Sequence, residues 1–334
     1  MNPPILGIDV SKDSLDVQLI IADKGVSAVF GNNPTGHKRL VCWLKKRCGQ
    51  EQVHACMEAT GMYAFPVAEV LYAAAQQVSV INPARISAYA KSLLARNKTD
   101  RLDAAIIADF CRTQSPPAWH PPREELRELQ ALVRLLEGLN TTHQAEVNRL
   151  KSGVRSAHVA RILQDHIAYL DDQIQQVEQL INAHIAQDDD LRRKKQLLCS
   201  IPGIGEKTAH TLLGELLYLD SFQNAKQVAA YAGLNPRQRL SGKMKGRSLI
   251  SKTGNAHLRK ALYFPAIVAK GCNPIIHQFC IRLEENGLVP MQVIIAGMRK
   301  LLHIAFGVLK NDCPFDPNSE HSFPQSQQIP AYSS

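Results

Sequence analysis

Four acidic side chains in the first third of the chain have the types and spacing needed for metal-dependent phosphoryl transfer. Asp9 lies in the run ILGIDV, Glu58 ends the run VHACME, and Asp100 and Asp103 lie in TDRLDAAIIADF. An Asp inside an apolar strand is costly to bury unless a cation compensates it. Asp100 and Asp103 are three residues apart at the start of a predicted helix, so they share one face. Mg²⁺ prefers such carboxylate oxygens together with substrate phosphates.

Each of these acids, taken alone, also fits an ordinary structural role. Asp9 can open a turn, Glu58 can be exposed, and Asp100 can cap a helix on which Asp103 is solvated. We favour a metal site because two acids at strand ends and two on a following helix can meet at one edge of a sheet. The sequence therefore predicts Mg²⁺, with Mn²⁺ as an alternative, bound by all four. Two ions about 4 Å apart can hold the attacking and leaving oxygens of a phosphoryl transfer.

A basic stretch indicates a polyanionic partner. Nine Lys and Arg residues, and no Asp or Glu, lie between Tyr231 and Gly271, and the net charge of the whole chain is also +9 (39 basic minus 30 acidic residues). Unopposed charges around several glycines favour a flexible segment that wraps phosphates. The residues predicted to bind nucleic acid here are Arg237, Arg239, Lys243, Lys245, Arg247, Lys252, Arg259 and Lys260, and Lys270 completes the nine.

A second element of this kind precedes the basic stretch. The run LLCSIPGIGEKTAHTLLGELLYL predicts a helix-hairpin-helix, in which Gly203 and Gly205 let backbone N–H groups approach a phosphate and Lys207 adds a charge. Such hairpins contact the DNA backbone without reading bases. An ordinary glycine-rich turn between two helices is the alternative.

The middle of the chain has the spacing of paired helices. Leu126, Leu129, Val133 and Leu136 begin one apolar seam, and a second seam runs from Leu163 to Ile181. Seams of this spacing predict an antiparallel coiled coil with a turn near residues 152–158. His143 and His184 resemble metal ligands, but polarity within the seam is the simpler explanation for both.

Several stretches, taken together, resemble the DEDD transposases of bacterial insertion sequences. GIDVSK, ACMEATG and DRLDA resemble the RuvC-like N-terminal domain of the IS-one-ten family, which is related to the Piv invertase. SIPGIGEKTA, AAYAGLNPRQRLSG and TGNAHLRKALY resemble the C-terminal transposase domain of the same family. The resemblance runs from about Ile5 to Pro314, and it implies a ribonuclease-H-like fold for the first domain.

The resemblance also selects a nucleophile and partners. Ser241, in RLSGKMKG, occupies the place of the family's serine, which attacks DNA to form a covalent phosphoserine link. Ser248 and Ser251 have almost the same local context, so the residues alone do not choose among the three. The family further implies donor and target DNA, a structured noncoding bridge RNA, and a homo-oligomer, either a dimer or a tetramer.

We therefore expect a multidomain protein that combines α/β and all-α parts. The expected domains are a RuvC-like catalytic domain over 1–114, a proline-rich linker over 115–122, an antiparallel coiled coil over 123–190, a helical transposase domain over 191–314 and a disordered tail over 315–334.

Composition narrows the cellular setting. Eight cysteines without a CxxC pair favour free thiols in a reducing compartment. We expect no basic-then-apolar leader and no apolar run of the roughly 20 residues that span a bilayer. These features predict a cytoplasmic bacterial protein without a membrane partner.

Three functions fit these features. The first is a DNA transposase or recombinase that uses Ser241 and the four acids, without ATP and hence without a Walker-type loop. The second is a junction resolvase or nuclease that uses the same acids with water as the nucleophile. The third is a DNA-binding protein without enzymatic activity.

Overall fold

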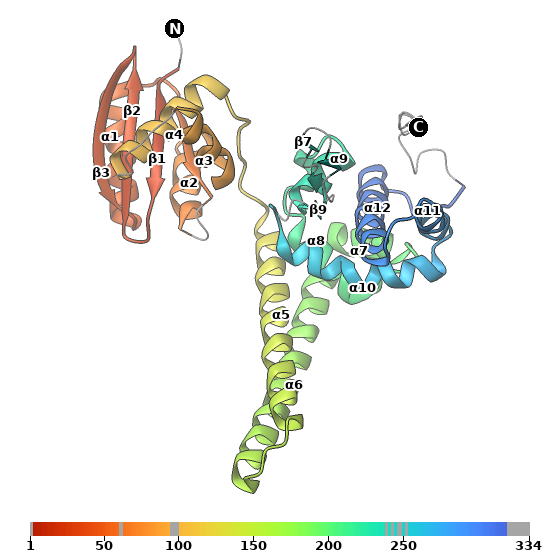
Figure 1. The fold of residues 1–334 in the computed structure, drawn as a ribbon. Helices are drawn as coiled ribbons and strands as arrows, with labels where there is room; N and C mark the ends of the chain where they lie inside the picture. The colour runs from red at the N-terminus through yellow and green to blue at the C-terminus, as the bar shows by residue number, and fades with distance from the viewer. Residues whose placement is uncertain are drawn as a thin grey trace. The chain divides into compact units, whose positions relative to one another are not determined.

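The computed structural model describes residues 3–59, 63–93, 100–237, 240–241, 244–245, 249–250 and 253–318. The chain forms two compact units, residues 1–121 and 122–334. Figure 1 shows the first as a sheet with helices and the second as an assembly of helices. This combination of α/β and all-α parts confirms the expected fold class.

The first unit is built on a sheet of five strands in the order β3-β2-β1-β4-β5. Strand β2 is antiparallel to β1 and β3, whereas β1, β4 and β5 run parallel. This order is that of a ribonuclease-H-like fold. The strands are β1 (Ile5–Val10), β2 (Ser14–Ile21), β3 (Lys24–Gly31), β4 (His54–Glu58) and β5 (Gln77–Ile81).

Helices cover both faces of this sheet. Leu6, Ile8 and Val10 of β1 are buried on the face that carries α1 and α2, where Phe30 of β3 packs edge-to-face on Trp43 of α1. The opposite face carries α4, which packs on β1, β2 and β4, with α3 beside it. The helices are α1 (Pro34–Cys48), α2 (Ala64–Ala73), α3 (Pro83–Ser92) and α4 (Asp100–Gln114).

The proline-rich segment after α4 is attached to the first unit. The Trp119 N–H donates to the Val78 carbonyl at 2.6 Å, and the Ser79 hydroxyl donates to the carbonyl of Pro117 at 2.8 Å. His54 completes this buried contact through its Nε2, 2.9 Å from the Ser79 hydroxyl. These contacts hold residues 116–119 against β5.

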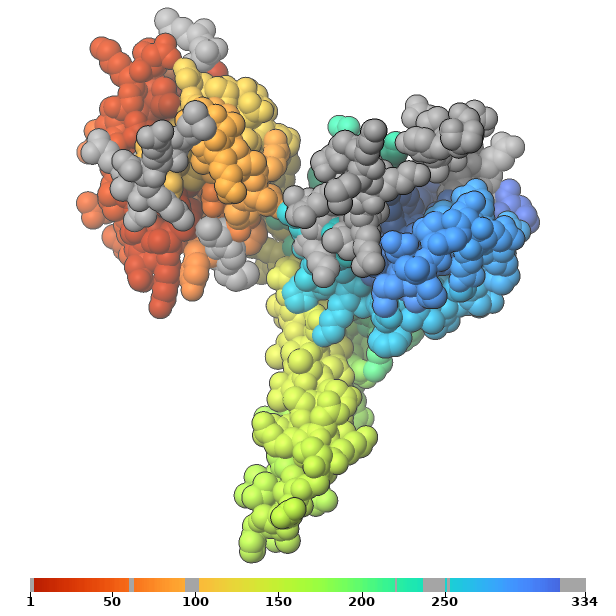
Figure 2. All heavy atoms as spheres, in the orientation of Figure 1, coloured from red at the N-terminus to blue at the C-terminus, as the bar shows by residue number. Residues whose placement is uncertain are grey.

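The second unit begins with two long antiparallel helices, α5 and α6, which lie side by side in Figure 1. His184 contacts the Glu125 carbonyl at 2.8 Å, and His143 lies 3.1 Å from Asp171, so the histidines join the two helices as seam polarity predicts. In Figure 2 the far end of this pair stands clear of the other helices of the unit. The antiparallel pairing of α5 with α6 and the turn between them are confirmed, whereas the supercoiling of the two helices stays a prediction.

The remaining helices of this unit pack around one apolar core. The elements of the unit are α5 (Glu124–Lys151), α6 (Ala157–Gln187), α7 (Asp189–Cys199), α8 (Glu206–Glu215), the 3₁₀ turn η1 (Leu219–Ser221), α9 (Ala225–Tyr231), α10 (Ala256–Cys272), α11 (Pro274–Glu285) and α12 (Pro290–Asn311), with short strands β6 (Pro236–Arg237), β7 (Leu240–Ser241), β8 (Met244–Lys245) and β9 (Leu249–Ile250) between α9 and α10.

Helix α12 corrects one expectation. We expected no apolar run of membrane-spanning length, yet α12 is long and apolar enough by composition. More than half of its apolar window, 56%, is buried inside the protein. Leu301, Leu302 and Ile304 belong to the core of the second unit, as in the central helix of a water-soluble domain.

Candidate active site

Asp9 and Glu58 lie next to each other at the carboxyl ends of two neighbouring parallel strands. In β1 and β4, Gly7 pairs with Cys56 and Ile8 with Met57, so the next step along each strand reaches Asp9 and Glu58. Side chains alternate between faces along a strand. Asp9 and Glu58 are therefore on the same face as Gly7 and Cys56, and both are half-buried.

Helix α4 brings its first turn to this edge of the sheet. A Cβ added to Gly7 would lie 2.2 Å from the Ala104 carbonyl oxygen and 2.4 Å from the Ala108 nitrogen, so β1 and α4 touch through their backbones. Near the other end of the helix, the Cys111 thiol donates to the His54 carbonyl at the start of β4, at 3.8 Å. The helix thus runs opposite to β1 and β4.

This orientation places Asp100 and Asp103 at the acidic edge. Gly7 of β1 contacts Ala104 of α4. Asp9 lies two residues beyond Gly7 towards the carboxyl end of the strand, and Asp100 lies one turn before Ala104 towards the start of the helix. Because the helix and the strand run in opposite directions, both steps lead towards the same edge of the sheet. The side chain of Asp100 lies outside the described residues. Among the side chains that are described, no group of three or more His, Cys, Asp or Glu residues is close enough to hold a metal.

A fifth acid, which the sequence analysis missed, lies on the same face. Asp16 of β2 is directly opposite Asp9 in the antiparallel register. Two carboxylates opposite each other repel and are unfavourable unless a cation lies near them. The donor set is carboxylate oxygen, which suits a hard divalent cation. The alternation of polar and apolar residues in SLDVQLII was the available signal.

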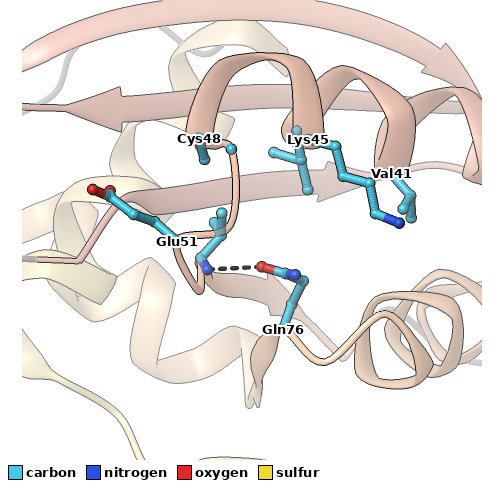
Figure 3. Close-up of a pocket in the computed structure, with 8 residues that line it drawn as sticks. Val41, Lys45, Cys48, Glu51 and Gln76 are labelled. Atoms are coloured by element: carbon cyan, nitrogen blue, oxygen red, sulfur yellow. Dashed lines mark hydrogen bonds between the residues drawn. The ribbon is translucent and has the colours of Figure 1, made fainter.

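The surface hollow in Figure 3 is a different place from this acidic edge. Val41, Lys45 and Cys48 of α1 line it together with Glu51, and the Val53 N–H donates to the Gln76 side chain at 2.7 Å. Val53 precedes β4, whereas Glu58 is the last residue of that strand. The hollow therefore lies at the opposite end of β4 from the acids.

Ser241 belongs to the second unit, where four short strands form two two-stranded sheets. Strand β7 pairs with β8, where Ser241 is opposite Met244, and β6 pairs with β9. The described residues of this segment form these short strands, and its expected flexibility stays a prediction. The Ser241 side chain, the side chains of Arg237 and Lys245, and all of Arg239, Lys243, Arg247 and Lys252 lie outside the described residues.

The expectation of unopposed charge is wrong for Lys260 and Lys270 of α10. Lys260 forms an ion pair with Glu137 of α5 at 2.8 Å, and Lys270 pairs with Glu284 of α11. Arg259 donates to the carbonyls of Ala232 at 2.9 Å and Gly254 at 3.1 Å, which fixes the turn after α9. Acids distant in the sequence thus offset part of the positive charge.

The two glycines of the predicted helix-hairpin-helix differ in their surroundings. Gly203 has a φ of 100°, and an added Cβ would lie 2.6 Å from the Ala269 Cβ, so the turn and its packing on α10 both need glycine. Gly205 precedes the first residue of α8, and nothing lies within 4 Å of its Cβ position. Lys207 pairs with Glu178 at 2.6 Å, although its side chain is 80% exposed.

A buried polar contact fixes the end of the basic segment. The Asn255 side chain caps α10 by accepting from the Leu258 N–H at 3.1 Å, and its amide donates to Glu215 at 2.7 Å. Glu215 is fully buried at the end of α8. The sequence analysis did not select this pair, although an acid within the apolar run TLLGELLYL was a signal.

Two family profiles match the chain in chain order. The profile described as "Transposase", of the DEDD type, matches residues 6–159, and that of the "Transposase IS116/IS110/IS902 family" matches residues 195–280. The first range contains the four predicted acids, and the second contains Ser241.

One relative is similar over nearly the full length of the chain, and a second is similar over about half of it. The chain is 35% identical to a pilin gene-inverting protein of Moraxella bovis over 319 residues, which cover 95% of this chain and 98% of the relative. It is 29% identical to the transposase for insertion sequence element IS1328 of Yersinia enterocolitica over 217 residues, 56% of this chain and 62% of that one.

Among solved structures, RuvC of T. thermophilus in complex with a Holliday junction substrate matches with 14% identity and a TM-score of 0.27, over 35% of this chain and all of that one. The fold assignment rests on the strand order, since that score is low. The two profiles and the near-complete alignment agree in order and extent. The chain belongs to the IS116/IS110/IS902 family of transposases, which are enzymes of DNA transposition and recombination.

Proposed function

We propose that this transposase cuts and rejoins DNA by serine transesterification, with Ser241 as the nucleophile and Asp9, Glu58, Asp100 and Asp103 as ligands of Mg²⁺. The observation that supports it most is that β1 and β4 end, and α4 begins, at the same edge of the sheet. The close backbone contact between Gly7 and Ala104 holds α4 in this position.

The chemical step conserves the phosphodiester bond. The Ser241 oxygen attacks phosphorus as it loses its proton, one P–O bond to the outgoing strand breaks, and that strand leaves as a hydroxyl after taking up a proton. A strand end from a second DNA then attacks the phosphoserine and releases the serine. Because one P–O bond forms for each that breaks, no nucleotide triphosphate is needed.

The acids would contribute to this step by holding a metal ion near the reacting phosphate. A bound Mg²⁺ supplies stabilisation of the negative charge that develops on the phosphate oxygens. Asp9 and Glu58 would hold it from the strand ends, and Asp100 and Asp103 from the first turn of α4.

The same proposal includes nucleic-acid partners and an oligomer. The four acids belong to the first unit and Ser241 to the second, so a working site requires both units, from one copy or from two. The net charge of +9 suits donor and target DNA, and equally a noncoding guide RNA that selects them by base pairing.

The test is a recombination assay in cells that carry the gene with its native flanking DNA and a target plasmid. It scores recombinant junctions and protein–DNA adducts that survive SDS. The key variants are Ser241→Ala and Asp9→Asn. Ser248→Ala and Ser251→Ala are matched controls because their local sequences resemble that of Ser241, and Asp13→Asn is the control for an exposed Asp in the same unit.

We expect junctions and adducts with the wild type and the three controls, and both products absent in Ser241→Ala and in Asp9→Asn. DNA cleavage that persists without adducts in Ser241→Ala would instead make metal-bound water the nucleophile. Undiminished recombination in Asp9→Asn would remove the acidic cluster from the chemistry.

A further inference from the structure

Helix α12 carries a group of cationic side chains that the proposed reaction does not use. Arg299 and Lys300 are adjacent, and His303 follows Arg299 by four residues, which places it one turn further along the same face. Helix α12 packs against α9, which carries Lys226, and against α11, which carries Arg282. These five residues are called the α12 cationic group.

Two nitrogen atoms of this group are buried without a hydrogen-bond partner. They are Nε of Arg299 and Nε2 of His303, and both are shielded from solvent. A buried polar group that makes no hydrogen bond costs about 1–3 kcal/mol, and more when it is charged. The Nε–H of Arg299 can only donate, so its missing partner is an acceptor, and Nε2 of His303 donates to the same kind of partner when the ring carries a proton there.

The charges around these atoms have one sign. Burial, then repulsion from Arg299, Lys300 and Lys226, lowers the pKa of His303 to about 4. Burial, then repulsion from Arg282, lowers the pKa of Lys300 to about 8, and burial lowers the pKa of Arg299. No carboxylate contributes to these shifts.

Two carboxylates near α12 form ion pairs with other helices, and Glu285 at the end of α11 is exposed. On α11, Glu284 pairs with Lys270 of α10, and beyond the end of α12, Asp312 pairs with Arg193 of α7 at 3.2 Å. Arg282 and Lys300 both lie over the Phe279 ring, at 5.6 and 5.9 Å from its centre, a contact that leaves their positive charge in place. Among the described residues, Nε of Arg299 therefore remains a buried hydrogen-bond donor without an acceptor, close to His303 and to the positive charge of Lys226.

We propose that Arg299 and His303, with Lys226 beside them, form a binding site for a backbone phosphate of a nucleic acid. A guanidinium matches the tetrahedral oxygens of a phosphate better than an ammonium does. The site lies on α12, beyond residues 195–280 that the transposase profile matches. The proposal rests on the family's action on DNA and not on the choice of Ser241 as nucleophile.

The test measures binding by the full-length protein. Fluorescence anisotropy follows a labelled DNA duplex and, separately, a labelled RNA strand, each of about 20 nucleotides per strand, across a range of salt concentrations. The variants are Arg299→Gln and His303→Gln. Lys310→Gln is the matched control because it removes one charge from the exposed end of the same helix.

We expect Arg299→Gln to weaken binding about tenfold and to reduce the slope of log K against log salt by about one, as loss of one phosphate contact requires. His303→Gln should weaken binding less, and Lys310→Gln should match the wild type. A loss confined to the duplex identifies DNA as the ligand, and a loss confined to the strand identifies RNA. Equal binding by Arg299→Gln and Lys310→Gln on both probes overturns the site.

A second measurement does not depend on the variants folding. In wild-type protein with ¹⁵N-labelled histidine, NMR titration gives the pKa of His303 with and without saturating duplex or RNA. A bound phosphate should raise that pKa by at least about one unit, because it supplies the missing acceptor and charge. An unchanged pKa with both ligands contradicts the proposal. Normal binding by Ser241→Ala would separate this result from any failure of the serine mechanism.

Discussion

Arg134 donates two hydrogen bonds to the carboxylate of Glu215, from Nε at 2.7 Å and from Nη2 at 3.0 Å. Glu215 is fully buried, and Asn255 donates to the same carboxylate at 2.7 Å. The three residues come from α5, from the end of α8 and from the cap of α10. One buried carboxylate therefore joins the long helical pair to the helices that border the Ser241 segment.

Arg134→Met should destabilise the second unit severely. The substitution keeps much of the side-chain volume but leaves Glu215 buried without its cation, and breaking a buried ion pair costs about 3–5 kcal/mol. The control is Arg192→Met on α7, where both members of the ion pair with Asp189 are exposed and the pair is worth about 0–1 kcal/mol. The urea concentration at which the second unit is half unfolded should fall for Arg134→Met and not for the control. The same midpoint in Arg134→Met and in the wild type would show that Arg134 is dispensable.

Gly7→Ala should separate α4 from the sheet. The new Cβ would overlap the Ala104 carbonyl oxygen at 2.2 Å, so the backbones must move apart. Overpacking of this kind costs about 1–3 kcal/mol or more, and we expect recombination to fall at least tenfold because Asp100 and Asp103 move with α4. Gly138→Ala on α5, which has nothing within 4 Å, is the control and should be neutral or slightly stabilising. Wild-type recombination by a folded Gly7→Ala protein would show that this contact does not position the acids.

Local patterns predicted several of the elements. The two apolar seams became α5 and α6 with a turn where it was expected, and the run predicted as a helix-hairpin-helix contains the end of α7 and the whole of α8. Period and capping signals are properties of neighbouring residues, so a sequence displays them directly.

Partners distant in the sequence could not be predicted in this way. Asp9 and Glu215 give the same signal, an acid in an apolar run, yet Glu215 meets an arginine 81 residues before it. Lys260, which looked unopposed, meets Glu137 from another helix. Only the tertiary fold decides whether such a charge is paired within the chain or remains for a ligand.

The buried His210 of α8 should make the second unit acid-sensitive. Burial first, and then repulsion from Lys195, lowers its pKa to about 4 from an ordinary value of 6.5, against opposing effects of Glu206 and Glu178. Between these pH values the unfolded chain binds more protons than the folded chain, so stability falls as pH decreases from about 6.5 towards 4.

Urea midpoints at pH 7 and pH 5 test this dependence. We expect the wild type to lose on the order of 1–3 kcal/mol more than His210→Gln over that interval, since one pKa unit corresponds to about 1.4 kcal/mol. His158→Gln, at an exposed position at the start of α6, should keep the wild-type dependence. The same pH dependence in His210→Gln and the wild type would assign the effect to other groups.

Coexpression of Asp9→Asn with Ser241→Ala decides whether one active site uses two copies of the chain. If the acids of one copy act with the serine of another, a mixed oligomer contains one site in which both components are intact and another in which both are lost. Recombination should then return to a measurable fraction of wild type, although each variant alone is inactive. If acids and serine come from the same copy, every site in the mixture carries one defect and no activity returns.

We expect activity to return, because the acids and the serine belong to separate compact units. Affinity pull-down of one tagged variant with the other confirms that mixed oligomers formed, so that inactivity in their presence places the whole site within a single copy.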